Sequence, residues 1–257
     1  EQDMRKMGGL AKKMPYTYIC MLIGSLALVA IPPFSGFFSK DLIIEAVMMS
    51  RLPGYHFAAF CVVGGTFLTA LYTFRMLFMV FHGKPRMSKE AYDHVKESSW
   101  SIVLPLVILA VPSIGAGWLF LKPALHGFFG GGIYIAPSHH TLAILAKETH
   151  SPWSMIKKAF FHLPFILSML GTLCAYLAYI VFPGVPKIFV SIFGWLYKLI
   201  AQKYFIDILY ERFFIGLAQS LGSFFWLILD AWVIDKAIVE GTAKNTKRVG
   251  DKVRKAQ

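Results

Sequence analysis

Long apolar stretches separated by short polar connections are the most regular feature of the sequence. A helix needs about 20 apolar residues to cross the ~30 Å hydrocarbon core of a bilayer. Four stretches reach that length, at about 15–49, 57–81, 100–121 and 160–182. The pattern predicts an all-α membrane protein in which residues 1–182 form a transmembrane helix bundle of four spans.

The first stretch is interrupted by the sequence IPPFSGFFSKDLIIE. Pro32 and Pro33 have no backbone N–H to donate. The carbonyls of Leu28 and Val29 therefore lose their usual helical donors, and Gly36 loosens the next turn. Unpaired backbone groups inside a bilayer are tolerated where protein covers them or water reaches them. We therefore expect one discontinuous helix, of the kind that lines ion sites in transporters.

Lys40 and Asp41 follow this break, between apolar neighbours. A Lys near the bilayer centre costs about 2.5 to 3.5 kcal/mol on insertion scales, so it is rare there. Asp41 points about 100° away from Lys40 on a helix, while Glu45 faces Asp41 at i,i+4. Lys40 therefore has no ion-pair partner in its own helix, and its partner must be another helix, water or a moving proton. These properties make Lys40, with Asp41 beside it, our candidate for a proton path.

A polar turn at the membrane surface is the alternative interpretation of the same residues. Residues 16–31 would then form a complete span, and residues 32–41 would lie among the headgroups. Periodicity alone leaves both interpretations open.

Arg75 is the charged residue of the second stretch. Its long side chain could extend to the headgroups, because the stretch ends only six residues later. Alternatively, Arg75 forms a polar lining on the inner face of the bundle together with Thr69, Tyr72 and Thr73, and Glu45 is a further lining residue. The sequence does not separate these two possibilities.

The part of the chain that follows residue 182 predicts a connector and then one long amphipathic helix. Eleven of the twelve charged residues from Asp207 to Lys252 fall on one half of a helical wheel stepped at ~100° per residue. A helix over about 204–255 would be roughly 75 Å long at 1.5 Å per residue. It would lie on the membrane surface or pack laterally along a row of transmembrane helices. A hydropathy window would instead place a fifth span at 213–229.

Composition supports the membrane assignment and charge predicts the topology. Of the 257 residues, 56% are hydrophobic and only 16% are charged, against about a quarter charged in soluble domains. The net charge is +12. Nineteen Lys and Arg fall before the first span, in 82–99 and after 182, and five fall on the opposite side. Short cytoplasmic loops collect Lys and Arg, so the first group of segments is expected to face the cytoplasm, or the matrix of a mitochondrion.

No motif for a metal or a cofactor is visible in the sequence. The three cysteines, Cys20, Cys61 and Cys174, lie far apart in apolar stretches and form no CxxC pair. His139 and His140 are adjacent, and adjacent side chains do not converge on one ion in an ordinary loop. We therefore expect no metal and no cofactor in this chain. The chain also starts without Met or a signal peptide, which predicts a fragment of a larger protein.

Three segments together resemble one protein family. They are KMGGLAKKMPYTY, the broken IPPFSGFFSKDLIIE, and LYTFRM followed by FHGK. In content, order and spacing they are similar to the large antiporter-like membrane subunit of respiratory complex I (NADH:quinone oxidoreductase), called subunit L in bacteria and subunit 5 in mitochondria. With the long C-terminal helix, the resemblance covers nearly the whole chain.

The resemblance implies a role in proton translocation for the broken helix. In that family a discontinuous helix carries a mid-membrane lysine on the proton path, and the resemblance places this lysine at Lys40. The family also uses a Glu–Lys pair, a further central lysine and histidines on earlier helices, together with a last anchoring span, and none of these occurs here. The chain thus resembles the C-terminal part of such a subunit, lacking the N-terminal half-channel and the final span.

As an implied function, the chain would be part of a proton-translocating subunit of an enzyme whose redox chemistry takes place in other subunits. Flavin, iron–sulfur clusters and quinone are expected there, and nucleic acid is not an expected partner. Its partners would be the other membrane subunits of complex I, including neighbouring antiporter-like subunits along the lateral helix, and the lipid bilayer. A multi-pass protein of the bacterial cytoplasmic membrane is expected rather than one of the mitochondrial inner membrane. The alternatives are the large subunit of a multisubunit sodium/proton antiporter and a structural membrane fragment with no ion path.

Overall fold

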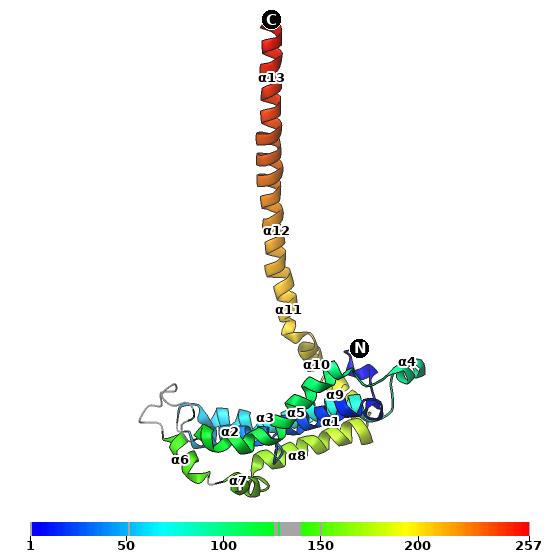
Figure 1. Ribbon diagram of the computed structural model, residues 1–257, viewed down its shortest axis with the longest axis vertical. Coiled ribbons are helices and arrows are strands. Elements are labelled where there is room, and N and C mark those ends of the chain that lie inside the picture. The colour runs from blue at the N-terminus through cyan, green and yellow to red at the C-terminus, as the bar shows by residue number, and fades with distance from the viewer. Residues whose placement is uncertain (1, 51, 126–127, 129–139, 150, 257) are drawn as a thin grey trace. The chain divides into compact units, whose positions relative to one another are not determined.

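The computed structural model describes residues 2–50, 52–125, 128, 140–149 and 151–256. Every regular element in these ranges is a helix, which confirms the predicted all-α class (Figure 1). The chain divides into two compact units, residues 1–187 and 188–257. Each unit is described by itself.

The helices of the first unit follow the apolar stretches of the sequence. Helices α3 (Tyr55–Phe81) and α5 (Trp100–Leu125) coincide with the second and third stretches, and α8 (Leu163–Tyr176) with the π-helical turn η4 (Leu177–Val181) coincides with the fourth. Each of these three is long and apolar enough to cross a membrane. The shorter elements are η1 (Met4–Lys6), η2 (Leu10–Lys12), α4 (Lys89–His94), α6 (Thr141–Glu148) and α7 (Pro152–Ala159).

The first apolar stretch forms two helices, α1 (Pro15–Leu28) and α2 (Ser35–Met49). With 14 residues, α1 is about 21 Å long, too short to cross the hydrocarbon core alone. Helix α5 packs against both α1 and α2. The two short helices therefore follow each other along one 26-residue helix, as the halves of a single broken span would.

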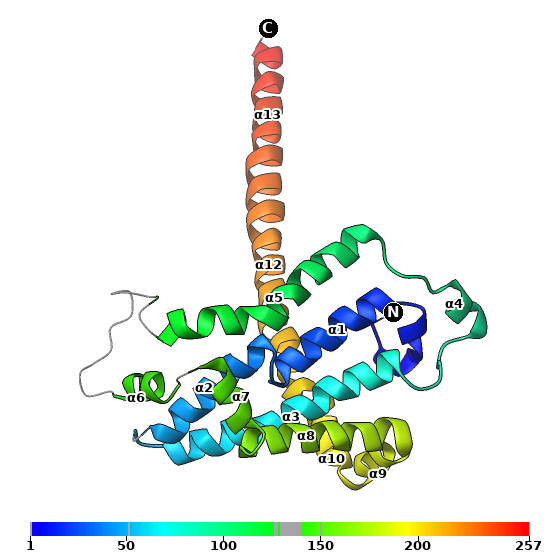
Figure 2. The same ribbon diagram turned by 60° about the horizontal axis from the view of Figure 1, so that its bottom comes forward.

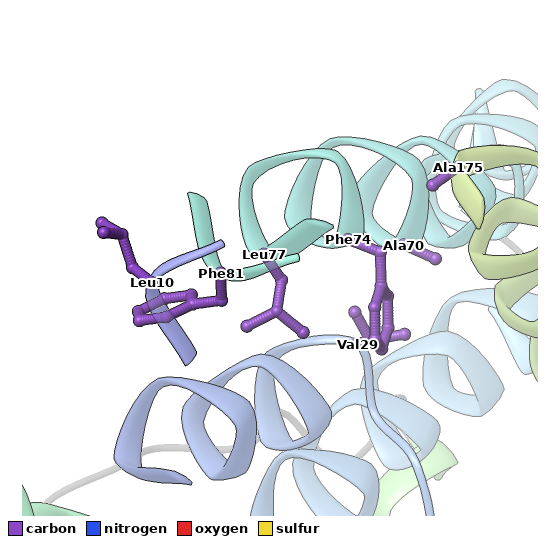
Figure 3. Packing of buried hydrophobic residues seen from close by; sticks show 7 residues of the cluster. All are labelled: Leu10, Val29, Ala70, Phe74, Leu77, Phe81 and Ala175. Atoms are coloured by element: carbon purple, nitrogen blue, oxygen red, sulfur yellow. The ribbon is translucent and has the colours of Figure 1, made fainter. Parts of the chain in front are cut away.

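Helix α3 packs most extensively against α8. Gly171 permits this contact, because a Cβ there would lie only 2.4 Å from the Phe67 carbonyl oxygen. Figure 3 shows the main core cluster, formed by Leu10, Val29, Ala70, Phe74, Leu77, Phe81 and Ala175. A second buried cluster joins α2, α5 and α7 and consists of Phe37, Phe38, Leu121, Met155, Ile156 and Ala159.

The connections of the first unit gather at its two ends. The N-terminal segment and α4 lie at one end, and α6 and α7 lie at the other, beside α2 (Figure 2). We call these the α4 end and the α7 end. Since α2 runs from the break toward the α7 end, successive turns of α2 lead from the break toward that end.

The second unit is a series of helices. They are α9 (Val185–Ile192), which begins in the first unit, α10 (Gly194–Ala201), η5 (Lys203–Phe205), α11 (Ile206–Leu209), η6 (Tyr210–Ile215), α12 (Gly216–Phe225), η7 (Trp226–Glu240) and α13 (Gly241–Ala256). The chain kinks at Lys203, Tyr204 and Phe205, which have φ of 50°, 58° and 60°. The expected long C-terminal helix is present beyond this kink.

Segments η6 and η7 are π-helical, with i→i+5 bonds and a smaller rotation per residue than an α-helix. The 100° step of the wheel is therefore wrong across these two segments. Within α13, which is an α-helix, the 100° step still applies, so the charged residues of α13 still fall on one face of the helix. By length and composition alone, the stretch Lys203–Lys255 could also cross a membrane.

Candidate functional site

The candidate site is built around the break between α1 and α2. Helix α1 ends in a Schellman motif, in which the amide of Ile31 donates to the Leu26 carbonyl and the amide of Ala30 to the Ala27 carbonyl. Ala30 adopts the left-handed φ of 65° that this motif requires, a position usually taken by Gly. The chain then passes through Pro32 and Pro33 and starts again as α2.

The two carbonyls that lose their helical donors at the prolines both accept hydrogen bonds from side chains. The ammonium nitrogen of Lys40 lies 2.7 Å from the carbonyl oxygen of Leu28. The hydroxyl of Ser168, on α8, donates to the carbonyl of Val29 at 3.4 Å. The partner of Lys40 is thus a backbone carbonyl of the other half of its own broken helix, a possibility that charge spacing alone did not suggest.

Gly36 lets the two halves of the broken helix approach each other. A Cβ at this position would lie 1.8 Å from the Ala27 carbonyl oxygen, which no side chain could tolerate. The sequence predicts that Gly36 loosens a turn, whereas in the structure Gly36 allows a close contact between two backbone segments. That contact brings the first turn of α2 beside the last turn of α1.

Helix α5 holds the break through three hydrogen bonds. The hydroxyl of Ser35 donates to the carbonyl of Pro112 at 2.7 Å and accepts from the amide of Gly117 at 2.9 Å. The indole N–H of Trp118 donates to the Pro33 carbonyl at 3.1 Å. Pro112 and Gly117 lie near the middle of the 26-residue α5, so the break lies at mid-height of that helix.

Lys40 and Asp41 line a small cavity beside the break. Its volume is about 20 Å³, enough for one water molecule. Thr66, near the middle of α3, and Ser168 also line it, among other residues. The structure therefore brings Lys40 and Asp41 together with hydroxyl groups of two neighbouring helices.

Asp41 also lines a second cavity, on the side of the α7 end. Glu45, Thr149, Ser154, Met155, Lys158 and His162 complete its lining. Ligand atoms of Asp41, Glu45 and His162 all lie within 4.8 Å of one another. Asp41 is 7% exposed, and its carboxylate accepts no hydrogen bond from a described residue. These three groups are of types that exchange protons, and they are also of types that bind metal ions.

The other predicted lining residues do not join this site. Thr69, Tyr72 and Arg75 are absent from the described lining of both cavities. The guanidinium of Arg75 lies over the ring of Tyr179, 5.5 Å from its centroid, and Tyr72 is exposed in the described structure. Tyr179 belongs to η4, toward the α4 end. His139 lies outside the described residues.

The functional residues that the sequence did not single out are Ser35, Gly117, Trp118, His162 and Ser168. Gly117, Trp118 and Ser168 contact the break from helices distant in sequence, and Ser35 occupies a polar position that looks like an ordinary first residue of a helix. His162 lines the second cavity with Asp41 and Glu45. His162 directly precedes α8, and the sequence predicts only this position next to the helix. No pattern in the sequence predicts that His162 lies close to α2.

A polar cluster at the α4 end fixes the start of α1. The Glu97 carboxylate accepts hydrogen bonds from the amide of Tyr16 at 2.8 Å and from the hydroxyl of Thr17 at 2.6 Å. Partial desolvation raises the pKa of Glu97, but these bonds and that from the Ser98 amide outweigh it and hold the pKa below its usual value. Beside it, His82 hydrogen-bonds the Tyr18 hydroxyl at 3.0 Å, and partial burial lowers the pKa of His82.

The fold and site together define a class of protein: a multi-pass α-helical membrane protein with a helix interrupted beside a lysine. Comparison with known families agrees, since the model of the family described as "NADH:quinone oxidoreductase/Mrp antiporter, TM" matches residues 1–69.

Comparison with individual proteins is more specific. The chain is 40% identical over 275 aligned residues to NADH-quinone oxidoreductase subunit L of Neisseria meningitidis serogroup B, covering all of this chain and 41% of the relative. NADH-ubiquinone oxidoreductase chain 5 of Chondrus crispus is 36% identical, over 91% of this chain and 36% of the relative. For the corresponding chain 5 of Dictyostelium discoideum, identity is 48% over 46% of this chain and 18% of the relative.

The chain therefore resembles subunit L of NADH-quinone oxidoreductase and the corresponding chain 5 along its whole length, as its motifs predicted. It spans about two fifths of the length of the curated relatives that it matches along its whole length.

Proposed function

We propose that this chain forms part of a transmembrane proton path in complex I, with Lys40 as the relay residue and Asp41 beside it. Redox chemistry in other subunits would drive the transfer. The chain's own residues would accept, hold and release protons at the break between α1 and α2.

The position of Lys40 is the observation that carries this proposal. Its ammonium bonds the unpaired Leu28 carbonyl at a break held against the middle of α5. If α5 crosses the membrane, this level is the centre of the bilayer, where a charged side chain is costly and usually functional. A polar turn at the membrane surface would place the break at an end of α5. In addition, α1 is too short to be the complete span that the surface interpretation needs.

The wider assignment follows from the relatives. Subunits named NADH-quinone oxidoreductase imply further complex I subunits as partners, and we place flavin, iron–sulfur clusters and quinone in those partners. The helix over Lys203–Lys255 would lie parallel to the membrane and pack along neighbouring antiporter-like subunits. The four-span topology, with the α4 end facing the cytoplasm of a bacterium, completes the proposal.

A sodium/proton antiporter is the alternative within transport, because the matching family description includes Mrp antiporters. The relatives matched over the whole chain are complex I subunits, which favours the redox-driven path. A structural fragment without an ion path is the third possibility. Reconstitution with and without the remainder of the parent subunit would distinguish that fragment from a transporter.

The test compares Lys40→Ala and Lys40→Arg in the assembled complex, measuring NADH oxidation and proton pumping in membrane vesicles. Lys40→Ala should abolish pumping through this subunit without preventing insertion. Lys40→Arg should not restore it fully, because guanidinium does not release its proton at accessible pH. Lys147→Ala, on the exposed face of α6, is the control. Normal pumping by Lys40→Ala would refute the proposal, and dependence of transport on sodium would favour the antiporter.

A further inference from the structure

Between Lys40 and the α7 end, the described structure contains a second group of exchangeable protons. We infer that His162 is the next proton carrier after Asp41 and, with Glu45, connects the lysine to the solvent at the α7 end. This inference rests on the proposed function of Lys40 and adds a residue that neither the sequence motifs nor the relatives assign.

The arrangement of the two cavities carries the first step. Lys40 and Asp41 share the cavity at the break, and Asp41 shares the second cavity with Glu45 and His162. Asp41 is therefore the residue common to both. Since it is more than nine-tenths buried and bonded by no described donor, its carboxylate is available to a water in either cavity.

The spacing of the groups carries the second step. Atoms of Asp41, Glu45 and His162 lie within 4.8 Å of one another, a gap that one bridging water or a small rotation of a side chain can close. His162 is half-buried at the start of α8, so its ring has access to both the cavity and the surface. Imidazole is the side chain whose ordinary pKa allows it to gain and lose a proton near neutral pH.

The elements that line the second cavity indicate the direction in which the proton would move. Thr149, Ser154 and Lys158 come from the residues that precede α7 and from α7 itself, at the end of the unit away from α4. Glu45 lies one turn of α2 beyond Asp41, farther from the break. The second cavity is thus between the break and the α7 end. The charge count predicts that this end faces away from the cytoplasm.

The transfer balances without any further reactant. The Lys40 ammonium passes a proton through water to the Asp41 carboxylate, which leaves a neutral amine and a neutral acid. Asp41 then protonates the neutral imidazole of His162 and becomes a carboxylate again. Imidazolium then releases the proton to water on the side of the α7 end. The side chains of Lys158 and Glu45 line the same cavity.

The test uses the assembled complex and compares His162→Gln and His162→Ala with Lys40→Ala. His162→Gln keeps a hydrogen-bonding side chain but cannot carry a proton at neutral pH. Its pumping rate should fall about tenfold or more, since a positioned proton-transfer group typically contributes about a hundredfold or more. Imidazole on the side of the α7 end should restore pumping to His162→Ala but not to Lys40→Ala. A merely structural histidine would not respond to imidazole.

Controls separate the possible failures. His56→Gln changes an exposed histidine at the start of α3 that lies outside the described lining of both cavities, and should pump normally. If His162→Gln pumps like His56→Gln while Lys40→Ala does not pump, the inference is wrong and the proposed function stands. If all three pump normally, the proposed function itself fails. Loss of wild-type pumping on treatment with EDTA would show that the three groups hold a metal ion and would also overturn the inference. If the His162→Ala complex does not assemble, the pumping rate of His162→Gln alone tests the inference.

Discussion

The ammonium nitrogen of Lys40 lies 2.7 Å from the carbonyl oxygen of Leu28, twelve residues earlier in the chain. This contact joins the two halves of the broken helix, so Lys40 has a structural role beside any role in proton transfer. The two roles are separable, because a structural donor needs only an N–H group and a relay needs a proton that it can release.

Lys40→Met and Lys40→Arg should therefore affect stability and transport differently. Lys40→Met leaves the Leu28 carbonyl without its donor and should cost about 1 to 3 kcal/mol of stability. Lys40→Arg retains N–H donors and should keep most of that stability, yet should not restore pumping. Thermal unfolding of the purified complex measures the first quantity and vesicle pumping the second. Equal stability of the Met and Arg variants would show that the contact with Leu28 contributes little.

Gly117→Ala should displace the break. A Cβ at Gly117 would lie 2.3 Å from Cδ2 of Phe38 and 2.9 Å from Cα of Ser35. The Phe38 ring can rotate away, but the backbone of Ser35 cannot, so we expect α2 to shift and pumping to fall. Gly115→Ala is the matched control, because a Cβ there meets nothing within 4 Å. Equal activity of the two variants would contradict the packing of α5 against the break.

Glu97 should make the stability of the α4 end depend on acid. Its pKa is held below the ordinary value, so the stabilisation is complete above the unfolded-state pKa of about 4.3 and is lost as the pH falls through the lower folded-state value. Glu97→Gln should remove this acid-dependent loss, and Glu90→Gln, an exposed residue of α4, should leave it unchanged. Thermal unfolding from pH 7 down to pH 3 measures it. If the unfolding temperature of Glu97→Gln depended on pH in the same way as that of the wild type, this carboxylate would be excluded as the cause.

Labelling of single cysteines should report the topology. With Cys20, Cys61 and Cys174 replaced by Ala, a cysteine at Lys89 on α4 should react only from the cytoplasmic side. A cysteine at Lys147 on α6 should react only from the other side. A membrane-impermeant maleimide added to vesicles of both orientations gives the answer. Reaction of both positions from one side would refute the four-span assignment.

Cleavage of the long helix should affect assembly more than transport. A protease site inserted at Gly241 should release subunits from one another while leaving the path through Lys40 nearly intact. The reason is that a lateral helix would bury its apolar stripe, including Leu217, Leu221 and Phe224 of α12, on neighbouring helices. The same insertion at Gly54, in the connection before α3, serves as a comparison within the bundle. Loss of pumping with assembly intact would contradict the lateral role.

The sequence predicted the helices and the location of the break because both depend on local chemistry. Apolar length sets the spans, and the missing N–H groups of Pro32 and Pro33 identify the carbonyls of Leu28 and Val29 as unpaired. The donors to those carbonyls could not be predicted. Ser168 lies 139 residues beyond Val29, and no local rule brings them together.

The helical wheel shows a second limit of local reasoning. It assumed one rotation per residue from 204 to 255, whereas Trp226–Glu240 is π-helical. Periodicity measures the angle between side chains only when the type of helix is known. For the same reason His162 was missed, since its relation to Asp41 depends on how α8 packs and not on its own neighbours in sequence.

The Schellman end of α1 has an electrostatic consequence. The last carbonyls of a helix carry a partial negative charge, and Lys40 is bonded to one of them without an ion pair to any described carboxylate. A dipole stabilises the ammonium without cancelling its unit of charge, as a carboxylate would. At an effective dielectric constant of ~20, that charge changes the energy of another charge roughly 10 Å away by about 2 kcal/mol. If Lys40 exchanges protons as proposed, each proton gained or lost there would change the energy of charged groups at that distance, which would give the break a means of acting on groups that it does not contact.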